Sequence, residues 1–559
     1  MSAIAIIIIA IVVLSIGYIF YGRFLAKKWG IDPNAKTPAY ELQDDLDYVP
    51  SDRGVVFGHQ FASIAGAGPI NGPIQAAIFG WVPILLWILF GGIFFGAVQD
   101  FASMYASVKN KGRTIGYIIE LYIGKAGKKL FLVFTWLFSI LIIAAFADII
   151  CKTFDGIDGT VAQNMAGAQV SVITMSFIVF AFVLGLLLRF CKLRGWPLRI
   201  VSVILLVASV VIGMRFPIFL SDQAWQIIIF VYVALACILP VWVLLQPRDY
   251  LNSYLLIAMI VASVVGIFVA NPTMKLDAFS GFMPNGQLMF PYLFVTVACG
   301  AISGVHALVS SGTSSKQVKN EKDILPVSYG AMLVESLLAV IALIAVGAGF
   351  SSSELAGAGT PSTVFATSIA SFLSVLHIPT DLSFSLITLS VSAFALTTLD
   401  SIARIGRLSW QELFLDSSIK DEDIHGVRKV VTSVYFSTGL MMVLAYFLVR
   451  IGYENIWPLF GASNQLLAAL ALIACAVYFK RTKKQGAFLW IPMIFMLATT
   501  LFSLVLTIVK NIKIIANGTV INIFGAIIQA GFAIAIFILG IIVAKQGFEK
   551  LRKKEEDSE

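Results

Sequence analysis

The stretch 58-GHQFASIAGAGPINGPIQAAIFGW-81 decides the fold class, because it is apolar enough to enter a membrane yet cannot form one continuous helix. Its centre holds three glycines and two prolines within eight residues: Gly66, Gly68, Pro69, Gly72 and Pro73. Proline removes a backbone donor, and glycine costs about 1 kcal/mol in a helix interior. Unwound backbone at membrane depth is tolerated only where it lines a cavity or is buried in protein. The stretch therefore predicts a broken transmembrane helix beside a binding site.

A second stretch, 296-TVACGAISGVHALVSSGTSSKQ-317, has the same character. It carries Gly300, Gly304 and His306, followed by a run of hydroxyl side chains from Ser310 to Ser315. Interrupted spans at corresponding positions of two halves are the usual sequence sign of a transporter's binding site. Small residues can also serve only to let helices pack closely, and that alternative stays open for both stretches.

The composition places these breaks in a membrane. Of the 559 residues, 59% are hydrophobic before the 44 glycines are added, whereas soluble domains have ~45–50% with glycine included. Only 13% are charged. This excludes a soluble enzyme, a nucleic-acid-binding protein and a disordered scaffold, despite the net charge of +8. The five cysteines show no paired spacing, so neither a disulfide framework nor a metal site is indicated.

Apolar runs of about 20 residues, the length that crosses a ~30 Å bilayer core, occur fifteen times. With the N-terminus outside and the C-terminus in the cytoplasm, 33 of the 39 Lys and Arg residues lie on the cytoplasmic side. We therefore predict an all-α polytopic membrane protein with about fifteen transmembrane helices. The expected spans are 3–22, 59–80, 83–108, 129–150, 170–188, 197–216, 225–245, 250–270, 291–312, 326–350, 380–403, 427–449, 456–478, 488–510 and 522–544.

The two broken stretches run in opposite directions under this topology, as an inverted repeat requires. Each is followed by a long helix with one acidic residue, Asp100 or Glu335, and then by a short amphipathic stretch at 114–123 or 362–376. We expect the following parts: a first helix and loop at 1–58, a first core half with inserted helices at 59–270, a second core half at 291–478, two peripheral helices at 488–546 and a charged tail at 547–559.

A third cluster lies at the cytoplasmic end of the span 380–403. A buried carboxylate beside hydroxyls can hold Na⁺ or carry a proton, and an ionisable residue inside a membrane is a functional hypothesis by default. The alternative is that Asp400 pairs with Arg404 one helical turn away. The residues that we expect to couple ion movement are Thr397, Thr398, Asp400, Asp100 and Glu335.

Four motifs point to a family. GHQFASIAGAGPINGP with GAVQDF (58–101), ACGAISGVHALVSSGT (298–313), FALTTLDSIARIGR (394–407) and LFGASNQLLAALAL (459–472) resemble the carbon starvation protein A family of bacterial inner-membrane transporters. That family has His-His where this chain has His59-Gln60. The resemblance implies uptake of pyruvate or short peptides during carbon limitation by proton symport, and a likeness to amino acid–polyamine–organocation transporters.

ALTTLDS also resembles the eighth core helix of sodium–solute symporters with the leucine-transporter fold. This second resemblance implies a leucine-transporter-like core. Seven spans rather than five separate the starts of the two repeats, so a seven-plus-seven inverted repeat stays open as the alternative.

We expect alternating access around a site formed by the two breaks. The N-terminus of a half-helix presents free N–H groups and a positive dipole, which suit a carboxylate. Asn71 and Gln75 can hydrogen-bond a carbonyl, and His306 can pair with the substrate or move a proton. The expected substrate contacts are Ala65, Gly66, Gly68, Asn71, Gln75, Gly300, Ser303, Gly304 and His306.

The coupling ion is expected to be H⁺ rather than Na⁺, with no cofactor, no catalytic residue and no nucleic-acid partner. A passive facilitator and a membrane nutrient sensor are the alternatives, although the chain has no large aqueous domain for signalling. An enzyme is disfavoured, because there are four histidines, no metal cluster and no nucleophile elbow. The sequence does not indicate the oligomeric state.

Overall fold

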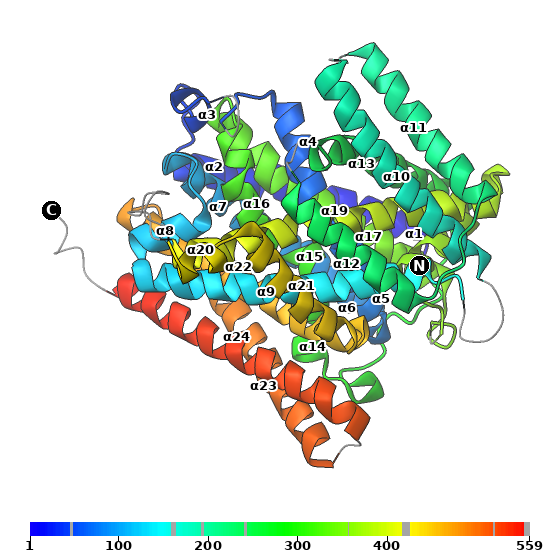
Figure 1. Ribbon diagram of the computed structural model, residues 1–559. Helices are drawn as coiled ribbons and strands as arrows, with labels where there is room; N and C mark the ends of the chain where they lie inside the picture. Colours follow the sequence, from blue (N-terminus) through cyan, green and yellow to red (C-terminus); the bar gives the residue numbers. More distant parts are fainter. Residues whose placement is uncertain are drawn as a thin grey trace. The chain divides into compact units, whose positions relative to one another are not determined.

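The computed structural model describes residues 1–44, 48–157, 164–191, 195–239, 243–355, 357–415, 425–517 and 520–552, and this part of the chain contains no β-strand. Eleven of its helices are long and apolar enough to cross a membrane. The chain is therefore an all-α polytopic membrane protein, as predicted (Figure 1). Two shorter apolar helices, α12 and α21, and the two broken stretches occupy the other four expected spans, so the count of fifteen crossings stays a prediction.

Contacts divide the chain into two compact units. Unit 1 comprises Met1–Ile6, Ser139–Asp277 and Ile344–Tyr453, and unit 2 comprises Ile7–Phe138, Ala278–Leu343 and Glu454–Glu559. Each unit draws segments from both of the expected halves. The inverted repeat and the domain limits predicted from the sequence stay predictions.

Unit 1 is built from paired helices. α10 and α11 pack closely, because Gly213 lets the two backbones approach at Ile173. Four helices begin with a side-chain cap, namely Asn164 for α10, Ser221 for α12, Ser433 for α21 and Thr360 for α18, where Pro361 follows at the first helical position. The elements are the end of α9 (Lys125–Phe154) with α10 (Met165–Phe190), α11 (Trp196–Arg215), α12 (Asp222–Ile238), α13 (Leu245–Ala270), α18 (Pro361–Leu373), η8 (Ser374–Leu376), α19 (Thr380–Phe414), α20 (Val427–Val431) and α21 (Val434–Val449).

Unit 2 contains both broken stretches and the helices that follow them. The first part of the chain supplies α1 (Ala3–Ile16), η1 (Gly17–Gly22), α2 (Arg23–Trp29), α3 (Pro38–Glu41), α4 (Arg53–Ile64), α5 (Gly68–Gln75), η2 (Ala76–Phe79), α6 (Trp81–Gly91), η3 (Gly92–Gly96), α7 (Ala97–Lys109) and α8 (Ile115–Tyr122). Later parts supply η4 (Pro284–Gly286), α14 (Met289–Thr296), α15 (Ala298–Ala301), α16 (Gly304–Gly312), η5 (Ser314–Lys316), η6 (Glu321–Asp323), η7 (Pro326–Gly330), α17 (Ala331–Gly349), α22 (Tyr453–Arg481), α23 (Ala487–Asn517) and α24 (Val520–Arg552).

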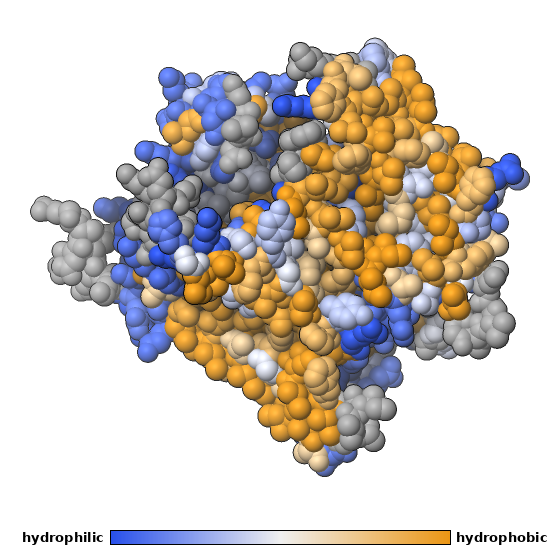
Figure 2. Space-filling model, viewed as in Figure 1, coloured by the Kyte–Doolittle hydropathy of each residue, from blue (hydrophilic) through white to orange (hydrophobic). Residues whose placement is uncertain are grey.

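Exposed apolar side chains cover the outer helices of each unit. In unit 2, hydrophobic residues line the α23–α24 pair, including Ile491 at 60% and Phe524 at 59% exposure (Figure 2). In unit 1, α11 exposes Ile204 and Val207 in the same way. By contrast α22 is buried along its apolar stretch. A lipid environment explains this pattern, because water would penalise such surfaces.

Candidate functional site

Both predicted helix breaks are confirmed, and both lie in unit 2. The first separates α4 from α5 at Ala65–Ala67, and Pro69 near the start of α5 has no N–H to leave unsatisfied. The second separates α15 from α16 at Ile302 and Ser303, which are extended. Each break exposes backbone groups that need partners inside a membrane.

The two breaks lie against each other. A Cβ atom added at Gly68 would lie 2.4 Å from Sγ of Cys299, and one added at Gly72 would lie 2.8 Å from the carbonyl oxygen of Thr296. Only glycine permits so close an approach of α5 to the second broken stretch. Gly300, a predicted substrate contact, instead packs against Ala339 of α17.

A buried acid–histidine–acid triad lies behind the second break. His306, two residues into α16, places Nδ1 3.0 Å from Oδ2 of Asp100 on α7 and Nε2 3.2 Å from Oε2 of Glu335 on α17. All three side chains are at most 1% exposed. The sequence singled out these residues separately, and the structure joins them into one site within unit 2.

The triad geometry requires a shared proton. A neutral imidazole donates one N–H and accepts at its other nitrogen, yet both ring nitrogens of His306 face carboxylates. Either the imidazole carries a second proton or one carboxyl group is protonated. Loss of that proton would leave two buried carboxylates around a neutral ring, which is strongly unfavourable. The arrangement is therefore favourable only while one proton is shared among the three side chains.

A π-helical turn precedes each acid of the triad. Asp100 follows η3 by four residues and Glu335 follows η7 by five residues. Such turns rotate the rest of a helix and occur frequently at functional sites. The buried hydroxyl of Tyr329 in η7 donates to the carbonyl of Ile93 in η3 at 2.9 Å, so the two turns are linked directly.

Asn464 of α22 caps the second half-helix. Its side-chain oxygen accepts from N–H of Gly304 at 3.0 Å and from N–H of Val305 at 3.2 Å, and its amide nitrogen donates to Oγ of Ser303 at 3.0 Å. Other side chains of α22 serve the opposite side of the break, since Gln465 donates to the carbonyl of Phe294 at 2.5 Å. The N-terminus of α16, where the sequence predicted a carboxylate, is thus occupied by a neutral amide.

The first half-helix is different. No side chain in the described part of the chain caps the N-terminus of α5. Asn71 is fully buried on α5, and neither Nδ2 nor Oδ1 of its side-chain amide has a hydrogen-bond partner or contact with solvent. Nε2 of Gln75 is also unpaired and buried. Unsatisfied buried amides are costly, so this half-helix has unused recognition groups.

Hydroxyl side chains close one end of α16 against its neighbours. Gln60 of α4 donates to Oγ of Ser310 at 2.8 Å and accepts from Oγ of Ser314 at 2.6 Å. Ser311 accepts from the N–H of Ile115 at the start of α8 at 2.9 Å. Gln60, where the family motif has a second histidine, therefore joins α4 to the end of α16 by neutral hydrogen bonds.

Asp400 belongs to an ion pair in unit 1. Arg248 donates to Oδ2 of Asp400, both side chains are fully buried, and the hydroxyl of Tyr232 donates to the same oxygen at 2.7 Å. The two hydroxyls that were predicted to couple ions beside Asp400 are also bonded: Thr397 accepts from Asn252 of α13, and Thr398 donates to the carbonyl of Phe394 in its own helix at 3.1 Å.

Arg404, the partner suggested by helical spacing, instead donates to the carbonyls of Ala236 and Leu239. Nothing in the sequence indicates that Arg248 is buried, because one arginine at the start of an apolar run is typical of a loop.

Outside the membrane-spanning segments, the loops of unit 2 are tied by ion pairs. Lys319 lies 2.6 Å from Asp52 and lowers the pKa of that exposed carboxyl group, chiefly through the hydrogen bond. Lys109 lies 2.5 Å from the buried Glu321. In the described part of the chain, no group of three or more His, Cys, Asp or Glu is arranged to hold a metal ion.

Comparison with known proteins gives a consistent result. The family model described as carbon starvation protein CstA matches residues 2–352 and 347–503. The chain is 33% identical to a peptide transporter CstA from Campylobacter jejuni, over 90% of this chain and 80% of that protein. It is 31% identical to the pyruvate/proton symporter BtsT of Escherichia coli, over 90% of this chain and 81% of that protein.

A solved manganese transporter from Eremococcus coleocola aligns with 89% of this chain and 94% of its own. The alignment has 12% sequence identity and a TM-score of 0.38.

Proposed function

This chain belongs to the carbon starvation protein CstA family, and from that premise we propose that it is a secondary active transporter that imports a small carboxylate nutrient with protons. The substrate class is pyruvate or short peptides, in keeping with the names of its relatives. The protein lies in the bacterial cell membrane with its N-terminus outside and its C-terminus in the cytoplasm, as the distribution of basic residues favours.

The observation that carries the proposal is the triad of Asp100, His306 and Glu335. It is fully buried, lies on three different helices of unit 2, and needs one shared proton. In the protonated form, His306 forms an ion-pair bridge between α7 and α17: Nδ1 donates a hydrogen bond to Asp100, and Nε2 lies 3.2 Å from Oε2 of Glu335 without hydrogen-bond geometry. After deprotonation, one nitrogen presents a lone pair to a carboxylate, and the bridge becomes repulsive. The proton therefore decides whether α16 is held between the two acid-bearing helices.

The substrate carboxylate is proposed to bind at the first half-helix. The unpaired side-chain amide of Asn71 offers a donor at the first half-helix, whereas Asn464 already fills the N-terminus of α16. A carboxylate and a proton that move together add no net charge to the site. Electroneutral entry avoids the cost of a lone charge at membrane depth, which is several kcal/mol.

Uptake of labelled pyruvate by the purified protein in proteoliposomes tests the proposal. An inward proton gradient, an inward Na⁺ gradient and no gradient are compared, with alanyl peptides as competitors. We expect accumulation with the proton gradient alone. Peptide flux without pyruvate flux would keep the mechanism and change the substrate, whereas flux that never exceeds equilibration would indicate a facilitator. Accumulation driven only by Na⁺ would contradict proton coupling at the triad.

A further inference from the structure

An apolar cavity of about 390 Å³ opens in unit 2 beside the linked π-helical turns. Its walls come from α1 and η1, from α4, and from η7 with α17, and they include Ile11, Leu14, Ile19, Phe57, Leu333 and Leu337. Its polar lining side chains are Ser15 and Tyr18. Because these helices are membrane spans or adjoin them, the natural filling for such a cavity is a hydrocarbon chain.

Two arginines mark one end of this cavity. Arg23 lies one helical turn beyond the lining residue Ile19, and Arg53 lies one turn before the lining residue Phe57. Both guanidinium groups lie near enough to the phenol of Tyr18 to act on it electrostatically. Both side chains are exposed, and neither forms an ion pair with an acid in the described part of the chain. The apolar slot is therefore lined by a phenol and flanked along the chain by two exposed arginines that form no ion pair in the described residues.

We propose that this cavity binds one anionic phospholipid, with an acyl chain in the slot and the phosphate between Arg23 and Arg53. Arginine suits a phosphate because its planar fork donates two parallel hydrogen bonds. The lipid lies against Leu333 and Leu337 on α17, the helix that carries Glu335 on its buried side. Bound lipid thereby supports the outer face of an acid-bearing helix.

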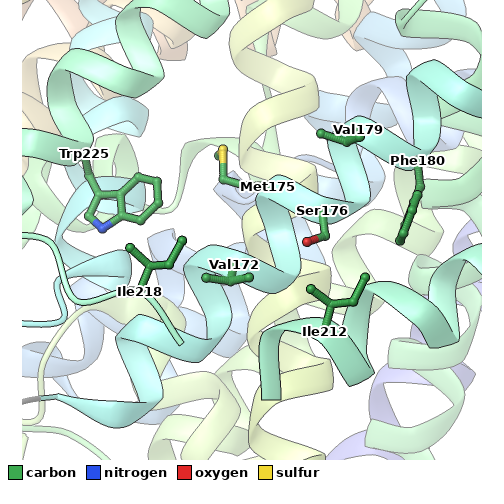
Figure 3. Close-up of a pocket in the computed structure, with 8 residues that line it drawn as sticks. All are labelled: Val172, Met175, Ser176, Val179, Phe180, Ile212, Ile218 and Trp225. Atoms are coloured by element: carbon green, nitrogen blue, oxygen red, sulfur yellow. The ribbon is translucent and has the colours of Figure 1, made fainter. Parts of the chain in front are cut away.

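A second cavity serves as an internal control. It measures about 340 Å³ and lies in unit 1, where Val172 and Ser176 of α10, Ile212 of α11 and Trp225 of α12 line it (Figure 3). It is equally apolar, but the residues next to its lining carry opposite charges. Asp222 lies one helical turn from Trp225, and Arg215 lies one helical turn from Ile212. Opposite charges flank this cavity, so it has no preference for an anionic headgroup.

The test uses the full-length protein in detergent, titrated with phosphatidylglycerol or with phosphatidylcholine of the same acyl chains and observed by native mass spectrometry. We expect one phosphatidylglycerol to bind more tightly than phosphatidylcholine. At ~1 kcal/mol for each arginine, Arg23→Gln with Arg53→Gln lowers the phosphatidylglycerol affinity roughly 25-fold and lowers the phosphatidylcholine affinity less, because choline already compensates the charge of that phosphate. Ser15→Phe, which fills the slot, weakens both lipids.

Two control variants separate the site from general effects. Lys545→Gln with Lys550→Gln removes the same charge from α24, and Ser176→Phe fills the cavity of unit 1; both are expected to keep the phosphatidylglycerol affinity. Equal wild-type affinity for the two lipids, or an arginine double variant that binds like wild type, would overturn the proposal.

A photoreactive phosphatidylglycerol gives a result without any variant. A diazirine on its acyl chain is expected to label peptides of α1 or α17 in the wild-type protein. Labelling confined to other helices would overturn the proposal, even if every variant failed to fold.

Discussion

Replacing Asp400 with asparagine tests whether the buried ion pair of unit 1 is structural. The substitution keeps the size of the side chain and the contact with Tyr232, but leaves the buried guanidinium of Arg248 with only the partly exposed Asp249 as an acidic partner. Removing one partner of a buried pair costs ~3–5 kcal/mol, because the other charge stays desolvated. We therefore expect Asp400→Asn to lower the free energy of unfolding by about that amount.

A double variant shows whether the unpaired charge of Arg248 causes the loss of stability. Arg248→Met combined with Asp400→Asn removes both charges, and replacing a buried pair by neutral groups is often harmless to stability. The double variant is expected to be more stable than Asp400→Asn alone by at least ~2 kcal/mol. Asp249→Asn is the matched control, since this second partner of Arg248 is 33% exposed and its loss is expected to cost less than ~1 kcal/mol.

Unfolding in mixed micelles with increasing SDS measures these free energies, and proteoliposome uptake measures function on the same samples. One result would refute the structural interpretation of Asp400. If Asp400→Asn is as stable as wild type but exchanges substrate without proton-driven accumulation, then Asp400 carries the coupling proton.

Two further predictions concern the groups that position the triad. Tyr329→Phe removes the hydroxyl that donates to the carbonyl of Ile93. We expect it to lower the free energy of unfolding in SDS by ~1–2 kcal/mol and to shift the pH profile of uptake. Tyr105→Phe also removes a buried hydroxyl and is expected to leave that pH profile unchanged. Asn464→Ala leaves the N–H groups at the start of α16 without their acceptor and is expected to lower maximal uptake. Asn464→Asp keeps the acceptor oxygen and is expected to retain more of the maximal uptake. Equal uptake by the two variants would show that the cap does not position His306.

The helix breaks could be predicted because their causes are local. Pro69 has no N–H and cannot continue a helix from the preceding turn, and the glycines clustered around it and around Gly304 weaken a helix further. The short helix beginning at Pro361 was also expected, and its Thr360 cap is a local signal. Local rules therefore gave the elements that surround the site.

The partnerships inside the site could not be predicted. His306 and Asp100 are 206 residues apart, and nothing near either residue specifies the other. The π-helical turn in GGIFFG has no distinct sequence sign, because small and aromatic residues are also typical of ordinary packing. Arg248 looked like a loop residue, and its burial depends on Asp400, which is 152 residues away. Such pairings are properties of tertiary packing.

Glu335→Gln is the most direct test of proton coupling at the triad of Asp100, His306 and Glu335. The amide keeps the size of the side chain and its place beside His306, but it cannot take a proton. Two activities are measured in the same proteoliposomes: accumulation of labelled pyruvate under an inward proton gradient, and exchange of labelled for unlabelled pyruvate without a gradient. We expect Glu335→Gln to retain exchange and to lose accumulation. A variant that accumulates pyruvate as wild type does would contradict proton coupling at the Asp100–His306–Glu335 triad.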